Sequence, residues 1–93
     1  MYRIIIERDV PGASELSDAQ VAEIARTSNA AVASLGVPYV WLSTFIAGDR
    51  FYCVHETDDA EAILEHARRG GFPVNRVSLV SREIGPRTAD ERL

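Results

Sequence analysis

The sequence predicts an α+β protein of one domain with the element order βαββαβ, the arrangement called ferredoxin-like. Four segments are rich in β-branched and aromatic residues, and two segments with apolar residues at helical spacing separate them. With 93 residues and 46% hydrophobic content, the chain can form a single core but not two. We therefore expect an antiparallel four-stranded sheet with two helices on one face.

The first strand and the first helix are marked at their ends. Residues 2–8 include three consecutive isoleucines, and a Pro-Gly turn at residues 11–12 ends this strand. Ser17 and Gln20 have the spacing of a helix capping box. Apolar residues then recur at helical spacing over residues 21–35, and a glycine directly afterwards ends the helix.

The second half of the chain predicts a hairpin, a second helix and a last strand. Residues 38–47 and 50–56 predict two strands, and a two-residue loop headed by glycine joins them. Asp58 is expected to open the second helix, which a pair of glycines ends. The last strand is expected over residues 76–84. The domain is expected to cover residues 1–86, followed by a polar tail over residues 87–93.

Charge and composition exclude several classes of function. The net charge is -4, from 14 acidic and 10 basic residues, and there is no basic run, so nucleic acids and anionic membranes are not expected partners. All basic residues are arginines, which excludes catalysis through a lysine amine. The single cysteine, Cys53, cannot form an intrachain disulfide. We find no secretory signal and no membrane-spanning run, and therefore expect a cytoplasmic protein.

The two-residue loop also predicts which side chains of the hairpin share a face. One face is expected to hold Trp41, Ser43, Phe45, Tyr52, Val54 and Glu56. The other, more aliphatic face is expected to pack against the helices, with Val40, Leu42, Thr44, Ile46, Phe51, Cys53 and His55. Because two helices cover only one face, the first set would stay exposed. We expect a second copy to cover it in a sheet-to-sheet homodimer, which forms a dimeric α/β barrel.

Four residues could supply ligands for a metal ion. Cys53 and His55 project from one strand face, His66 lies at the edge of the apolar stripe of the second helix, and Glu56 is a nearby carboxylate. Imidazole, thiolate and carboxylate groups suit divalent transition metals. Other interpretations stay open, because a lone strand cysteine is commonly a buried small hydrophobe and His66 could point into solvent.

The aromatic face offers a different kind of site. Trp41, Ser43, Tyr52 and Glu56 could line a pocket between subunits, with hydroxyl groups orienting a small organic ligand. The same residues could equally be interface packing. Glu56 could also form a structural ion pair, with Arg8 or Arg82 as its partner.

Several short motifs, in order and over nearly the whole chain, resemble a known family. They are Glu7-Arg8, Pro11-Gly12, Trp41 with Ser43, Tyr52-Cys53-Val54 with Glu56, Glu65-His66-Ala67, Gly71-Phe72-Pro73 and Arg76-Val77. The family consists of small bacterial ferredoxin-like proteins classed as a domain of unknown function, and its characterised member binds nickel. The resemblance implies a dimeric α/β sandwich or barrel.

The same resemblance singles out Cys53, Glu56 and His66 as candidate nickel ligands. The chain departs from the family where His55 replaces an aromatic residue and where Gly85 replaces an aspartate. If that aspartate binds metal in relatives, this chain lacks one ligand, for which His55 could compensate with an altered metal preference.

Our first hypothesis is therefore a noncatalytic, homodimeric protein that binds nickel or another divalent transition metal through His66, His55, Cys53 and Glu56. The alternative is a dimeric-barrel enzyme or binding protein for a small organic molecule, with Glu56 or His66 moving a proton if it is an enzyme. A third reading is an accessory subunit that stabilises a partner.

Overall fold

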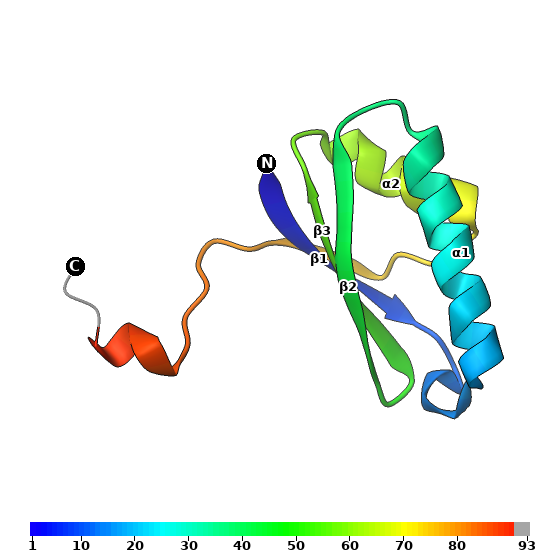
Figure 1. The fold of residues 1–93 in the computed structure, drawn as a ribbon, viewed down its shortest axis with the longest axis horizontal. Helices are drawn as coiled ribbons and strands as arrows, with labels where there is room; N and C mark the ends of the chain where they lie inside the picture. Colours follow the sequence, from blue (N-terminus) through cyan, green and yellow to red (C-terminus); the bar gives the residue numbers. More distant parts are fainter. Residues whose placement is uncertain (91–93) are drawn as a thin grey trace.

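The computed structural model of the chain describes residues 1–90, which form a four-stranded sheet with two helices on one side (Figure 1). The elements are β1 (Tyr2–Asp9), α1 (Asp18–Ser34), β2 (Tyr39–Ala47), β3 (Arg50–Thr57), α2 (Ala60–Gly70) and β4 (Arg76–Leu79). The strand order is β2-β3-β1-β4, and every neighbouring pair is antiparallel. The predicted βαββαβ order and the ferredoxin-like arrangement are therefore confirmed.

The capping of the helices explains where each one starts. At α1, Ser17 Oγ accepts from the Gln20 amide at 3.2 Å and Gln20 Oε1 accepts from the Ser17 amide at 2.8 Å, which confirms the predicted capping box. For α2 the prediction was wrong by one residue, because Asp59 is the cap and accepts from the Glu61 amide at 3.0 Å. The carboxylate of Asp58 lies 3.6 Å from the N-terminal amine instead.

The last strand is shorter than the sequence predicts. β4 ends at Leu79, opposite Ile4, and the Val80 amide still donates to the Arg3 carbonyl at 2.9 Å. Beyond that point β1 has only two residues left, so an antiparallel partner would have almost no backbone to pair with. The segment after β4 leaves the sheet on the side away from the helices and ends in a short 3-10 turn, Pro86–Asp90 (Figure 1).

The hairpin register is confirmed from the turn as far as Ser43 and is wrong beyond it. Ala47 pairs with Arg50, and Ser43 with Val54, as predicted, but a β-bulge then makes Leu42 an extra residue and pairs Trp41 with His55 rather than with Glu56. Trp41 therefore points to the helix side of the sheet.

The bulge reverses the predicted faces for three residues. Trp41, expected on the exposed face, lies on the helix side, whereas Val40 and Leu42, expected against the helices, lie outside. An extra residue in a strand shifts the inside-outside alternation of everything before it.

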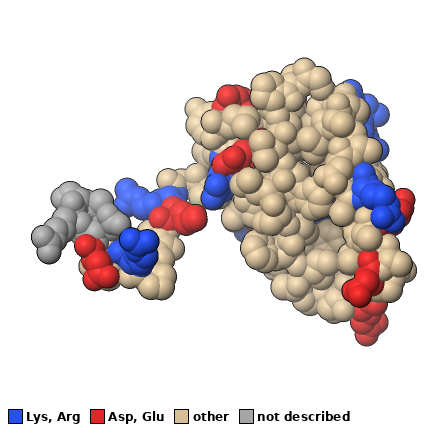
Figure 2. Space-filling view, viewed as in Figure 1, with Lys and Arg blue, Asp and Glu red and all other residues tan. Residues whose placement is uncertain are grey.

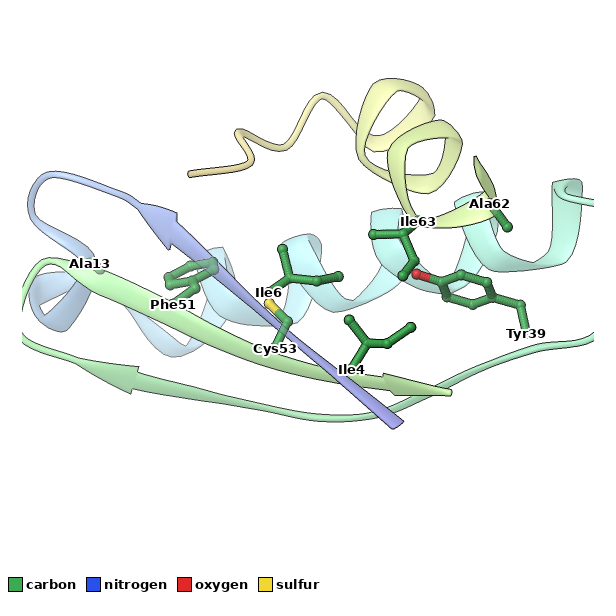
Figure 3. Close-up of a cluster of buried hydrophobic side chains, with 8 residues drawn as sticks. All are labelled: Ile4, Ile6, Ala13, Tyr39, Phe51, Cys53, Ala62 and Ile63. Atoms are coloured by element: carbon green, nitrogen blue, oxygen red, sulfur yellow. The ribbon is translucent and has the colours of Figure 1, made fainter. Parts of the chain in front are cut away.

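The core lies between the sheet and the two helices. Ile4 and Ile6 of β1 and Phe51 and Cys53 of β3 point to the helix side of the sheet, and Ile63 of α2 belongs to the same buried cluster (Figure 3). Alternate residues of β1 and β3 are buried, as expected where only one face of a sheet is covered by helices.

The opposite side, which we call the outer face, is apolar along the edge strand β2. Phe45 is 63% exposed, Leu42 43% and Val40 37%. Figure 2, in the side view of Figure 1, shows charged side chains around the edges of the domain and on the C-terminal segment, with a broad uncharged area on the side that carries β2 and α1. No helix within residues 1–90 is long and apolar enough to cross a membrane, and the cytoplasmic location stays a prediction.

Candidate functional site

A cavity of about 150 Å³ lies between α1 and the helix side of the sheet. We call it the Arg8 cavity. Its walls are mainly apolar, and its lining residues are Arg8, Val21, Ile24, Ala25, Ser28, Trp41, Thr44, Ile46, Phe51, Cys53, His55, His66 and Phe72. It thus combines apolar walls with a few polar groups, as ligand sites commonly do.

Arg8 is the charged group of this cavity. It follows Ile4 and Ile6 on the buried face of β1, and it is only 1% exposed. Its Nη1 donates to the Pro73 carbonyl at 2.7 Å, its Nε donates to Cys53 Sγ at 3.4 Å, and its guanidinium carbon lies 5.3 Å from the centre of the Phe72 ring. Within residues 1–90 no carboxylate pairs with Arg8, and its Nη2 has no hydrogen-bond partner.

Two buried histidines stand beside each other in the same cavity. Both are 1% exposed, and their ring centres are 5.0 Å apart. His55 Nδ1 is 2.5 Å from the Tyr39 hydroxyl, and His66 Nε2 is 3.1 Å from the Ser28 hydroxyl. The His66 ring is also stacked on Tyr39 at 5.5 Å and on Phe72 at 5.6 Å. The second nitrogen of His66, Nδ1, has no partner among the described residues.

Burial makes both imidazoles neutral at pH 7. It lowers the pKa of His55 to about 3, with further lowering by His66 and Arg8, and it lowers the pKa of His66 to about 4, with further lowering by Arg8. Burial likewise raises the pKa of Tyr39, so that its hydroxyl stays protonated. Of Arg8, His55, His66 and Tyr39, only Arg8 carries a charge at pH 7.

The structure brings together some of the predicted site residues and separates others. Cys53, His55 and His66 line one cavity, which Trp41 joins because of the bulge. His66 is fully buried rather than at the edge of the apolar stripe.

The remaining predicted site residues lie on the outer face. Tyr52 and Ser43 alternate with the buried residues of their strands. Glu56 pairs with Arg3, Nη2 to Oε2 at 3.2 Å, and not with Arg8 or Arg82 as expected. The pocket predicted around Trp41, Ser43, Tyr52 and Glu56 is thus divided between the two faces.

The sequence analysis did not assign most of the cavity residues to a site, among them Arg8, Ser28 and Phe72. A signal existed for Arg8, because it continues the period-two series of Ile4 and Ile6 and so had to share their buried face. Ser28 lies within the helix that the sequence predicts over residues 21–35, but it was not assigned to a site.

Comparisons with known proteins place this chain in a family. A family described as "Nickel responsive protein SCO4226-like" matches residues 5–80. The chain belongs to this family. The resemblance seen in the sequence is therefore confirmed, and nickel responsiveness is the property that the family name records.

One solved structure shows the fold of the SCO4226-like family. The crystal structure of SCO4226 from Streptomyces coelicolor A3(2) matches with a TM-score of 0.70 and 15% identity, covering 88% of this chain and 99% of the other. At this identity the likeness concerns the fold alone. Among curated protein sequences none matches significantly.

The family name raises the question of whether these residues fit a nickel ion. Two imidazoles and a thiol are suitable donors in kind. Their arrangement does not fit, because Arg8 donates to Cys53 and Glu56 lies across the sheet. Within residues 1–90 no group of three His, Cys, Asp or Glu side chains is placed to hold a metal ion.

Proposed function

We propose that this chain is a noncatalytic binding protein and that its ligand occupies the Arg8 cavity. One observation carries the proposal: two residues that line the cavity, Arg8 and His66, each have a buried nitrogen without a partner among the described residues. Buried polar groups are nearly always hydrogen-bonded, since leaving one unpaired costs about 1–3 kcal/mol. A bound ligand would supply the missing partners.

The lining chemistry favours binding over catalysis. The residues described around the cavity include no carboxylate, and each imidazole is held neutral with one nitrogen in a hydrogen bond. A general base needs a pKa near the working pH, and burial takes both histidines well below it.

Nickel binding by the same cavity is the second candidate function. The family name supports it, and so does the neutral state of His55 and His66, because imidazole must be unprotonated to bind a metal. Of the four ligands predicted from the sequence, only Cys53, His55 and His66 line the cavity. They are not placed to hold a metal ion as they stand, so nickel binding would require these side chains to rearrange and Arg8 to turn away from Cys53.

Trp41 provides the assay, because it is the one tryptophan of the chain and lines the cavity. We would titrate metal-free protein with nickel chloride and, separately, with small organic acids and amides, following Trp41 fluorescence. Saturable changes with an organic probe would support the first candidate. Stoichiometric nickel binding that His66→Ala abolishes would support the second, and no response to any probe would refute both.

We also propose that the chain works as a homodimer closed through its outer face. Phe45, Leu42 and Val40 are exposed there, and the segment after β4 extends away from its own domain, with Ile84 73% exposed. That segment and the sheet line one hollow, which includes Ile5, Phe45 and Ile84. An exposed apolar surface beside a protruding segment suits a two-fold assembly.

The dimer is tested by molar mass in solution. We expect light scattering on a sizing column to give twice the chain mass, and Phe45→Asp to halve it. Leu64→Asp is the matched control, since Leu64 is 58% exposed on α2 and away from the outer face. A wild-type monomer, or equal dissociation by both variants, would refute this interface.

A further inference from the structure

We propose that the ligand of the Arg8 cavity is a small carboxylic acid with a compact apolar body, held as its anion by Arg8. This inference rests on the proposed binding function and adds the chemical class of the ligand. Charge, donor number and cavity shape each support it.

The charge argument begins with the guanidinium of Arg8. A buried cation is stable only with a partner, because removing it from water costs several kcal/mol. Among residues 1–90, Arg8 has a thiol, a carbonyl and an aromatic ring around it but no anion. The neighbouring side chains that could titrate, Cys53, His55, His66 and Tyr39, include no carboxylate. An anionic ligand would supply the missing charge.

The number of free donors favours a carboxylate over a larger anion. Nε and Nη1 of Arg8 are engaged, which leaves Nη2. His66 adds Nδ1, which carries a proton when the Ser28 hydroxyl donates to Nε2. A carboxylate has two oxygens, one for each of these two nitrogens. A phosphate or sulfate would bring more acceptors and more charge than one guanidinium and one neutral imidazole can satisfy.

The apolar walls of the Arg8 cavity determine the size and polarity of the rest of the ligand. Apart from the polar residues, the cavity is lined by aliphatic and aromatic side chains, namely Val21, Ile24, Ala25, Trp41, Ile46, Phe51 and Phe72. Its volume of about 150 Å³ equals that of an apolar protein cavity known to accept benzene. Ile46 is 39% exposed, so the wall that it forms is open toward solvent. A branched short-chain acid or an aromatic acid of one ring matches this space.

The test compares acids with amides of the same shape. Sodium benzoate and sodium isobutyrate are titrated into the wild-type chain beside benzamide and isobutyramide, with Trp41 fluorescence and thermal unfolding as readouts. We expect at least one acid to bind about 10- to 100-fold more tightly than its amide, the range expected for a charge-assisted hydrogen bond. This comparison needs no variant.

A matched pair of variants then assigns the effect to Arg8. Arg8→Met removes the positive charge and keeps an unbranched side chain. It should reduce the affinity for the acid about 10- to 100-fold, to the affinity of the matching amide. Arg26→Met is the control, because Arg26 is an exposed arginine of α1 paired with Glu23. It should leave both affinities unchanged.

The outcomes separate this inference from the proposed function. Equal binding of acid and amide would overturn the carboxylate inference and leave a binding cavity in place. Binding of nickel alone would also overturn it, in favour of the second candidate. No response to acids, amides or nickel would overturn the inference together with the proposed function.

Discussion

Lowering the pH from 7.5 to 5 is expected to destabilise the fold, because His55 and His66 are buried as neutral rings. Burial lowers their pKa values to about 3 and about 4, whereas an unfolded histidine titrates near 6.5. Between these values the unfolded chain binds protons that the folded chain does not. The free energy of unfolding therefore falls as the pH falls through 6.5, and the stability is fully present above about pH 7.5.

The size of the effect follows from the distance between pH 5 and the unfolded pKa. At 1.36 kcal/mol per pH unit, each histidine costs about 2 kcal/mol at pH 5, and the pair about 4 kcal/mol. The exact folded pKa values hardly matter at this pH, since both lie below it. Against a typical total stability of about 5–15 kcal/mol, such a loss is large.

Urea unfolding followed by Trp41 fluorescence at half-unit pH steps, at constant protein concentration, measures this loss. The chain has only two histidines, so the window from pH 7.5 to 5 is free of other imidazoles. Arg68 and Arg69 hold the pKa of the Glu65 carboxyl low, at about 2, so Glu65 affects stability only at more acid pH. His66→Gln removes one titrating ring and should roughly halve the slope of stability against pH.

A stability that stays constant from pH 7.5 to 5 would refute the reasoning, because it would mean that the histidines can be protonated in the folded chain. A stability that rises toward pH 5 would refute it more strongly, because it would require a carboxylate partner for the imidazolium ions. If the slope of stability against pH is the same in His66→Gln as in the wild type, His66 does not contribute to the loss of stability.

Two further substitutions test local features of the fold, each beside a matched control in urea unfolding. Gly70→Ala should cost about 1–3 kcal/mol, because a Cβ there would lie 2.3 Å from Cε2 of Phe72, whereas Gly85→Ala, which meets nothing within 4 Å, should change little. Ser17→Ala should cost about 1 kcal/mol through loss of the α1 cap, and Ser81→Ala, at an exposed position, should be neutral. Equal effects within either pair would contradict the assignment.

The elements of the fold were predictable where local residues mark their ends. Ser17 and Gln20 determine the start of α1, and Gly71, at φ +72°, ends α2 in the left-handed conformation that glycine favours. Gly48, at φ +60°, sets the two-residue turn and with it the first part of the hairpin register.

Features that depend on distant partners were not predictable in this way. The end of β4 depends on how much of β1 remains to pair with it, which no residue of β4 reveals. The bulge at Leu42 was hidden because both faces of β2 carry apolar side chains, so a one-residue shift leaves the hydrophobic pattern equally plausible.

The candidate site could be predicted only where the strand that carries its residues is regular. Alternation along β3 correctly put Cys53 and His55 on the helix side, since no irregularity interrupts that strand. Trp41 could be added only with knowledge of the bulge. Arg8 was overlooked because an arginine is expected at the surface, although its place in the strand required burial.

The extra residue at Leu42 also affects how this chain should be aligned with its relatives. A relative without the bulge would have one residue fewer in β2, and a gap-free alignment would then match the cavity tryptophan to a residue of the outer face. Insertions of a single residue are easily placed in loops by alignment, where they look harmless. In β2, the position of the gap decides which residue of a relative is aligned with Trp41. It therefore decides whether that relative is thought to have an aromatic residue in the cavity beside Arg8.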